Sequence, residues 1–255
     1  TQDTKDQYAR LYSDKVVDYI NSLDLPRYGL GNYIIKKPPR SLTKDENAII
    51  QNLSRAGKRL MGFCRTNLFK RLESSGYAFL LSISRHILRN FVFIHALENH
   101  LALPIGKNIV ENLDGFLEDD DTDRVDGDST IAFILDENQY LKRAEEVYHL
   151  FVTKYKNRFV WLKHDLVQSD LIKALIADAR ILIKVLSIVK QWNPEDDRKL
   201  NALVNLLVNT HKKEKILVFT QYSDTADYLN QQLVTRNVRD HAVVTGETEK
   251  PTHFV

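Results

Sequence analysis

The sequence contains a single cysteine, Cys64, so an internal disulfide and a metal site built from several cysteines are both excluded. Sparing use of cysteine is typical of a reducing compartment. No apolar run approaches the ~20 residues that a membrane-spanning helix needs. Residues 1–7 are polar and do not resemble a signal peptide. We therefore expect a cytoplasmic protein without a membrane partner.

Methionine is equally scarce. The only one is Met61, and the chain begins at Thr1. We therefore expect this chain to be a piece of a longer protein.

Several motifs that carry chemistry are missing. There is no GxxxxGK[ST] loop to hold nucleotide phosphates, and no GxGxxG, GxSxG or HExxH. The acidic stretch fails as a calcium loop, because placing Gly127 at position 6 puts Phe133 at position 12, where a carboxylate is required. The sequence therefore predicts no catalytic residue, no metal site and no cofactor in this fragment.

Charge is segregated along the chain although the net charge is only +2. Residues 25–72 hold eleven bases and two acids, a balance of +9, which is the electrostatic footprint of phosphate-backbone binding. Residues 111–128 hold nine acids and one base, a balance of −8, and predict a mobile acidic loop at about 106–136. The alternative for the basic stretch is a solvated helix face that complements the acidic loop.

Helical periodicity dominates residues 1–200. One amphipathic stripe runs over residues 8–23, and Thr43 with Glu46 forms a capping-box pattern that opens a helix to about Ala56. Further helices are expected from Gly57, over 77–100 with a broad buried face, and over 137–156, 166–190 and 196–210.

From residue 201 the pattern changes. Residues 215–220 (KILVFT) and 242–245 (AVVT) predict buried strands on either side of a helix that Ser223 or Asp224 can cap. Strand, helix and strand in about thirty residues predict a βαβ unit with parallel strands. Because two parallel strands form no stable core, we expect residues 201–255 to begin a larger, truncated α/β domain; the alternative is a two-stranded appendage. The predicted fold class is mostly α with a C-terminal α/β portion.

Several passages resemble bacterial Swi/Snf-class helicase-like ATPases, which are superfamily-two DNA translocases. Residues 65–75 (RTNLFKRLESS), followed by Ala78 and Phe79, resemble the block after the first motor lobe. Residues 215–229 (KILVFTQYSDTADYL) resemble motif IV, which opens the second lobe, and residues 244–246 (VTG) follow as the next strand end. Shorter likenesses occur at residues 25–30 (LPRYGL) and 196–200 (DDRKL).

The resemblance implies that residues 1–200 form a helical inter-lobe region and that 201–255 begin a RecA-like lobe. The complete parent would use ATP and magnesium, move on double-stranded DNA and lie at the bacterial nucleoid. Walker A, Walker B, motif V and motif VI are missing here, so we expect no ATP hydrolysis by this fragment alone. Its partners would be DNA and the remaining motor domains of the same chain.

Seven residues are candidate nucleic-acid contacts. Thr220 and Gln221 end the first predicted strand next to a helix N-terminus, where hydroxyl, amide and backbone N–H groups can bind a DNA phosphate. Alternatively, Thr220 is an ordinary strand residue without a binding role and Gln221 an exposed loop residue. Thr245 and Gly246 hold the equivalent place on the second strand. Arg65, Lys70 and Arg71 come from the basic stretch, and because they do not share one helix face we expect at least one to pair with a carboxylate, Glu73 being near in sequence.

Two other functions remain open. The chain could be a non-enzymatic helical module whose charged segments bind proteins. It could also be a small nucleotide-binding α/β protein with a helical cap, although it lacks any glycine-rich loop.

Overall fold

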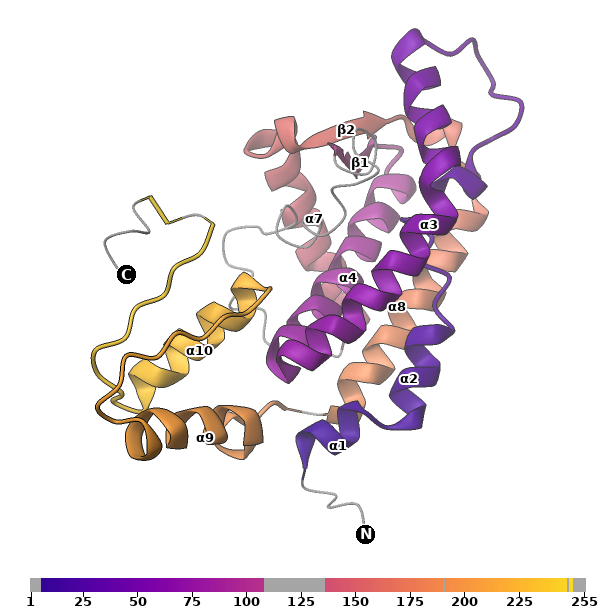
Figure 1. Cartoon of the computed structure of the whole chain (residues 1–255). Coiled ribbons are helices and arrows are strands. Elements are labelled where there is room, and N and C mark those ends of the chain that lie inside the picture. The colour runs from indigo at the N-terminus through magenta and orange to yellow at the C-terminus, as the bar shows by residue number, and fades with distance from the viewer. Residues whose placement is uncertain (1–5, 108–135, 190, 247, 250–255) are drawn as a thin grey trace.

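The computed structural model describes residues 6–107, 136–189, 191–246 and 248–249. Within them the protein is predominantly helical (Figure 1). The two longest helices are α3 (Lys44–Ser74) and α4 (Gly76–Glu98), which lie side by side and meet at Ser75. Ser75 is extended, and its side chain accepts a hydrogen bond from the Ala78 N–H, so it caps α4 as α3 ends.

Helix α4 is the centre of the bundle. It packs against α3, α7 (Glu137–Thr153) and α8 (Asp170–Val189), so nearly its whole length is buried, as its broad apolar pattern predicts. Burial extends to its polar residues, among them Arg85, His86 and Asn90. Polar side chains in so apolar a helix need partners, and these partners tie other segments to the bundle.

The N-terminal segment is held to the bundle by polar contacts. It forms α1 (Gln7–Leu11), α2 (Asp14–Asn21) and a turn at Leu25, where φ is +50°. The buried Asp178 carboxylate of α8 accepts the Asp24 and Leu25 N–H groups at 2.9 and 2.7 Å, which offsets the cost of this left-handed backbone. Arg27 then enters the core, donating to Asn90 at 3.0 Å.

A small antiparallel sheet caps one end of the bundle (Figure 1). Strand β1 (Leu103–Gly106) pairs with β2 (Phe159–Leu162), with Leu103 opposite Leu162 and Gly106 opposite Phe159. Short 3-10 turns lie on both sides of β2, and a further one, η1, is formed by Leu30–Tyr33.

The C-terminal segment, residues 191–249, forms η6 (Pro194–Asp196), α9 (Arg198–Asn205), a π-helical turn (Leu206–Thr210) and α10 (Ser223–Thr235). The predicted parallel βαβ unit is wrong for the part of the chain that the structure describes, where the only sheet is the antiparallel β1–β2 pair. Residues 215–220 and 242–245 flank α10 as predicted but form no strands. Instead of being buried, Leu217 is 62% and Phe219 88% exposed. A short apolar run becomes a strand only when a ladder partner and cover are supplied.

The predictions for the helices are confirmed in part. The capping box is confirmed, since Thr43 and Glu46 exchange both of its hydrogen bonds. The expected break at Gly57 is wrong, because α3 continues through it with Leu53 and Leu60 buried on either side. The single stripe over residues 8–23 is divided between α1 and α2. The predicted acidic loop lies almost wholly outside the described residues.

Helix α4 is apolar, yet no helix in the described ranges is both long enough and apolar enough to cross a membrane.

Candidate nucleic-acid interface

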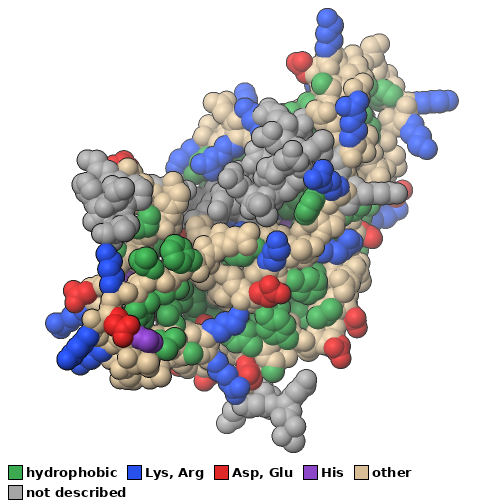
Figure 2. Space-filling view, viewed as in Figure 1, with side chains coloured by type: hydrophobic (Ala, Val, Ile, Leu, Met, Phe, Trp, Pro, Cys, Tyr) green, Lys and Arg blue, Asp and Glu red, His purple; other side chains and the backbone are tan. Residues whose placement is uncertain are grey.

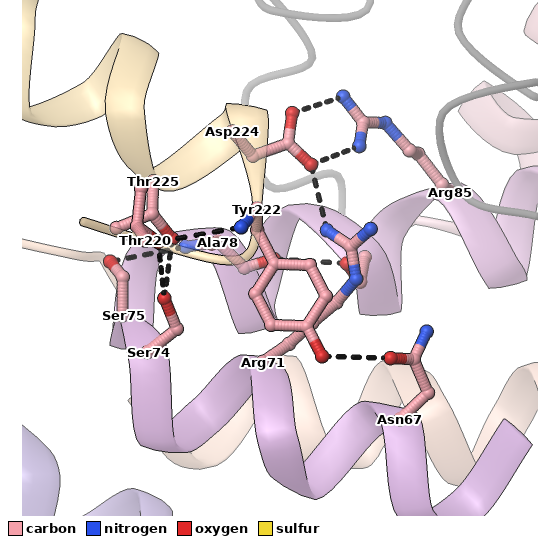
Figure 3. Close-up of polar contacts among 11 residues, drawn as sticks. Asn67, Arg71, Ser74, Ser75, Ala78, Arg85, Thr220, Tyr222, Asp224 and Thr225 are labelled. Carbon is pink, nitrogen blue, oxygen red and sulfur yellow. Dashed lines mark hydrogen bonds and ion pairs between the residues drawn. The ribbon is translucent and has the colours of Figure 1, made fainter. Parts of the chain in front are cut away.

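Residues 65–79 and 215–229, two passages singled out in the sequence, lie next to each other in the structure. The start of α10 is inserted where α3 ends and α4 begins (Figure 3). The ion pair at its centre joins Arg71 and Asp224, which are 153 positions apart in the sequence. Helix α10 is thereby tied to the bundle by its first turn.

Asp224 is held by two arginines. Arg71 of α3 donates from Nη1 to Oδ2 at 2.8 Å, while Arg85 of α4 donates to both carboxylate oxygens at 2.6 and 3.0 Å. All three side chains are buried, with Arg71 2%, Arg85 5% and Asp224 4% exposed. At least one of the three basic candidates was expected to pair with a carboxylate, for which Glu73 was named; Arg71 does so, but with Asp224. Neither Asp224 nor Ser223 caps α10, whose N-cap is Tyr222.

Aromatic and hydroxyl groups surround this ion pair. The Arg71 guanidinium lies 4.5 Å from the centre of the Tyr222 ring, and the Tyr222 hydroxyl donates to Asn67 at 2.8 Å. Ser74 Oγ lies 2.9 Å from Thr225 Oγ1 and 3.2 Å from Thr220 Oγ1. The end of α3 thus contacts residues on both sides of the α10 N-terminus (Figure 3).

A second contact fixes the middle of α10. The Tyr228 ring stacks on Tyr77 at 4.6 Å, its hydroxyl donates to Asp197 at 2.9 Å, and the Trp192 indole donates to that hydroxyl at 3.1 Å. Burial, with the Asp197 carboxylate close by, raises the pKa of Tyr228 well above its usual value, so it remains a neutral donor. The start and the middle of α10 are therefore both anchored.

The sequence-predicted contacts occupy different environments. Thr220 and Gln221 are exposed immediately before α10. Thr245 is half-buried, with its N–H donating to Thr248 Oγ1, and Gly246 is exposed. Residues 241–246 follow α10 as an extended stretch, whereas Thr220 and Gln221 precede the helix.

The three basic candidates also separate. Lys70 is exposed on α3. Arg65 is half-buried, and its guanidinium donates to the Leu23 carbonyl oxygen. Arg71 is buried against Asp224.

The wider basic stretch is divided between the interior and the surface. Arg27 is buried, and Arg40 pairs with both Glu46 and Asp165. Arg40 also holds the pKa of the Glu46 carboxyl down to about 2. Six bases are exposed among those whose side chains the structure describes: Lys36, Lys37, Lys44, Arg55, Arg59 and Lys70. Figure 2 shows blue side chains at the end of the molecule where α3 begins.

Exposed lysine and arginine side chains suit the binding of an anionic polymer. No cluster of three or more histidine, cysteine or carboxylate side chains in the described residues could hold a metal ion. Sequence reasoning missed Arg85 and the role of Asp224, although an arginine in the middle of an apolar helix was a signal that a buried carboxylate must face it.

We compared the chain with models of protein families, with curated proteins and with solved structures, and none of these comparisons gave a match.

Proposed function

We propose that this chain is part of a Swi/Snf-class DNA translocase, in which it contacts the DNA backbone and braces the second motor lobe without hydrolysing ATP itself. One observation carries the proposal. The two passages that resemble this class, residues 65–79 and 215–229, pack against each other through the buried Arg71–Asp224–Arg85 ion pair. Two likenesses found independently in the sequence thus belong to one structural unit.

Double-stranded DNA is the proposed partner because of the exposed bases along 36–70 and the exposed hydroxyl and amide of Thr220 and Gln221. Lysine and arginine supply salt-sensitive affinity for phosphates, and hydroxyl and amide groups position the backbone. Arg59 lies 5.4 Å from the centre of the half-exposed Phe63 ring, so the basic face also carries an aromatic side chain.

The remaining motor domains of the same parent chain are the second proposed partner. Leu217, Val218 and Phe219 are 62%, 53% and 88% exposed, in an extended stretch that joins no sheet within the ranges described. Full burial of a large apolar side chain contributes about 1.5–3 kcal/mol of stability. Three successive side chains that stay in water lose much of that contribution. Further polypeptide from the parent would cover them, while ATP and magnesium would bind elsewhere in that parent, in the bacterial cytoplasm at the nucleoid.

The test is binding of a fluorescent duplex followed by anisotropy over a salt series. If four of the exposed bases reach phosphates, the logarithm of the affinity falls against the logarithm of salt with a slope of about −3.6. Replacing Lys36, Lys37 and Lys44 by glutamine flattens that slope. Replacing Lys142 and Lys184, which are exposed on α7 and α8, leaves it unchanged. Absence of salt-sensitive binding would refute the DNA role.

A helical protein-interaction module is the alternative, and the exposed apolar residues 217–219 favour it. It predicts a protein ligand captured through residues 215–220 and no affinity for duplex DNA. The nucleotide-binding α/β alternative loses its basis, because the described residues contain no parallel sheet.

A further inference from the structure

Arg71 belongs to the basic stretch but does not face solvent. Its side chain is 2% exposed, and its Nη1 donates to Asp224. A DNA phosphate could reach this guanidinium only after α10 had left its place on α3 and α4. Any effect of Arg71 on DNA binding is therefore exerted through Asp224, the residue to which it is bound.

Arg71 and Arg85 together hold the first turn of α10. Arg85 binds the carboxylate as a two-pronged fork, which fixes the orientation of Asp224 as well as its position. Immediately before this turn, Thr220 is exposed, and its hydroxyl contacts Ser74 of α3 at 3.2 Å. Thr220 thus lies beside Ser74, close to the turn whose carboxylate the two arginines hold (Figure 3).

We propose that Asp224 is a positioning residue for the contact that Thr220 and Gln221 make with the DNA backbone. Arg71 and Arg85 serve that contact through the clasp, the pair of guanidinium groups that bind the Asp224 carboxylate. The DNA half of this inference rests on the proposed function. The clasp itself is a property of the fold and is tested separately.

A buried carboxylate shared by two guanidinium groups suits this purpose. Removing one member of a buried charged group is far more disruptive than replacing the whole group, because the remaining charges lose their partner. An apolar contact would tolerate sliding, whereas the fork fixes direction. The clasp is therefore sensitive to substitution of any of its members, and it gives the start of α10 a defined geometry.

The clasp is tested by hydrogen exchange on Asp224→Asn, with no DNA present. Amide protection of residues 222–235 falls on the order of a hundredfold, while protection of α8 is retained. Asp227→Asn is the matched control, because Asp227 is exposed on the same helix. Unchanged protection of α10, or an equal loss in α8, would overturn the clasp, since the first denies it and the second makes it a general support of the fold.

The positioning role is tested by the salt dependence of duplex binding. Lys70→Gln removes a proposed phosphate contact and reduces the magnitude of the slope by about one. Arg71→Gln weakens binding several-fold with the slope unchanged, because the lost affinity comes from misplaced polar groups. Arg71→Lys, which keeps the charge without the planar guanidinium, does not restore affinity. A slope reduced equally by Arg71→Gln would show that Arg71 itself meets a phosphate and would overturn the proposal.

These two experiments fail in different ways. If the unmodified chain binds no duplex, the proposed function and the positioning role both fall. The exchange experiment still decides whether Asp224 clasps α10.

Discussion

Gly76 packs against Trp192 of the C-terminal segment, so Gly76→Ala should loosen the junction between that segment and the bundle. A Cβ placed on Gly76 would lie 2.4 and 2.6 Å from Cη2 and Cζ3 of Trp192 and 3.0 Å from a methyl carbon of Leu11. Trp192 is buried, meets Tyr8 edge-on at 5.5 Å and donates to Tyr228. The indole must therefore move by about 1 Å to reach ordinary contact distance, which disturbs both interactions.

Two effects oppose each other in this variant. Alanine favours a helix over glycine by up to about 1 kcal/mol, and less at the first position of α4. Forcing a methyl group into a packed site costs about 1–3 kcal/mol, and a strained indole–hydroxyl hydrogen bond adds about 1 kcal/mol. We expect Gly76→Ala to lower the free energy of unfolding by about 1–4 kcal/mol.

Urea denaturation followed by circular dichroism measures this change, and Gly62→Ala is the matched control. Gly62 is within α3 and a Cβ there would meet nothing within 4 Å, so alanine should stabilise the protein by about 0.5–1 kcal/mol. In Gly76→Ala combined with Trp192→Leu, the two costs should be less than additive because the clash has gone. Stabilisation by Gly76→Ala equal to that of the control would refute the steric argument.

Three further outcomes are expected. Burial raises the pKa of the Asp178 carboxyl to about 6 from its ordinary 3.8, so the folded state binds more protons than the unfolded state between these pH values. The free energy of unfolding should therefore fall by up to about 3 kcal/mol as pH rises from 4 to 7. An NMR titration that places the Asp178 pKa near 4 would contradict this. Thr43→Ala removes the cap of α3 and should cost about 1 kcal/mol in urea denaturation. Thr66→Ala, exposed in the middle of the same helix, should instead stabilise the protein slightly, by up to about 0.7 kcal/mol, because alanine is the better helix former. Phe219→Ser should leave the free energy of unfolding unchanged within about 0.5 kcal/mol, because the ring is 88% exposed, and should reduce self-association measured by light scattering; a marked loss of stability would show that the ring is packed.

The helices were predictable because their signals are local. The Thr43 capping box joins residues three apart, and the apolar pattern of α4 is continuous along one element. The uninterrupted α3 was not predictable at Gly57, because a penalty of about 1 kcal/mol for glycine is outweighed by packing that the sequence does not display. Leu53 and Leu60, on either side of it, are 1% and 2% exposed.

The candidate site was predicted only in part, for a different reason. Counting charge along residues 25–72 treats every base as equally exposed, yet Arg27 and Arg71 are buried. Each of them is held inside by a partner far away in sequence, Asn90 for Arg27 and Asp224 for Arg71. Charged and amide residues inside the apolar pattern of α4 were the available evidence that such partners exist.

The wrong prediction of two strands follows from what a strand requires. Residues 215–220 have the composition of a buried strand, but the state of such a segment depends on the backbone that pairs with it and the side chains that cover it. The described residues supply neither, so the same apolar side chains that predict burial are exposed, with Phe219 at 88%. Local preference and tertiary surroundings are inconsistent at 215–220, and natural sequences rarely tolerate such conflict without a reason. The polypeptide that we propose as a cover would resolve it, and we expect the environment of residues 215–220 to change most when that polypeptide binds.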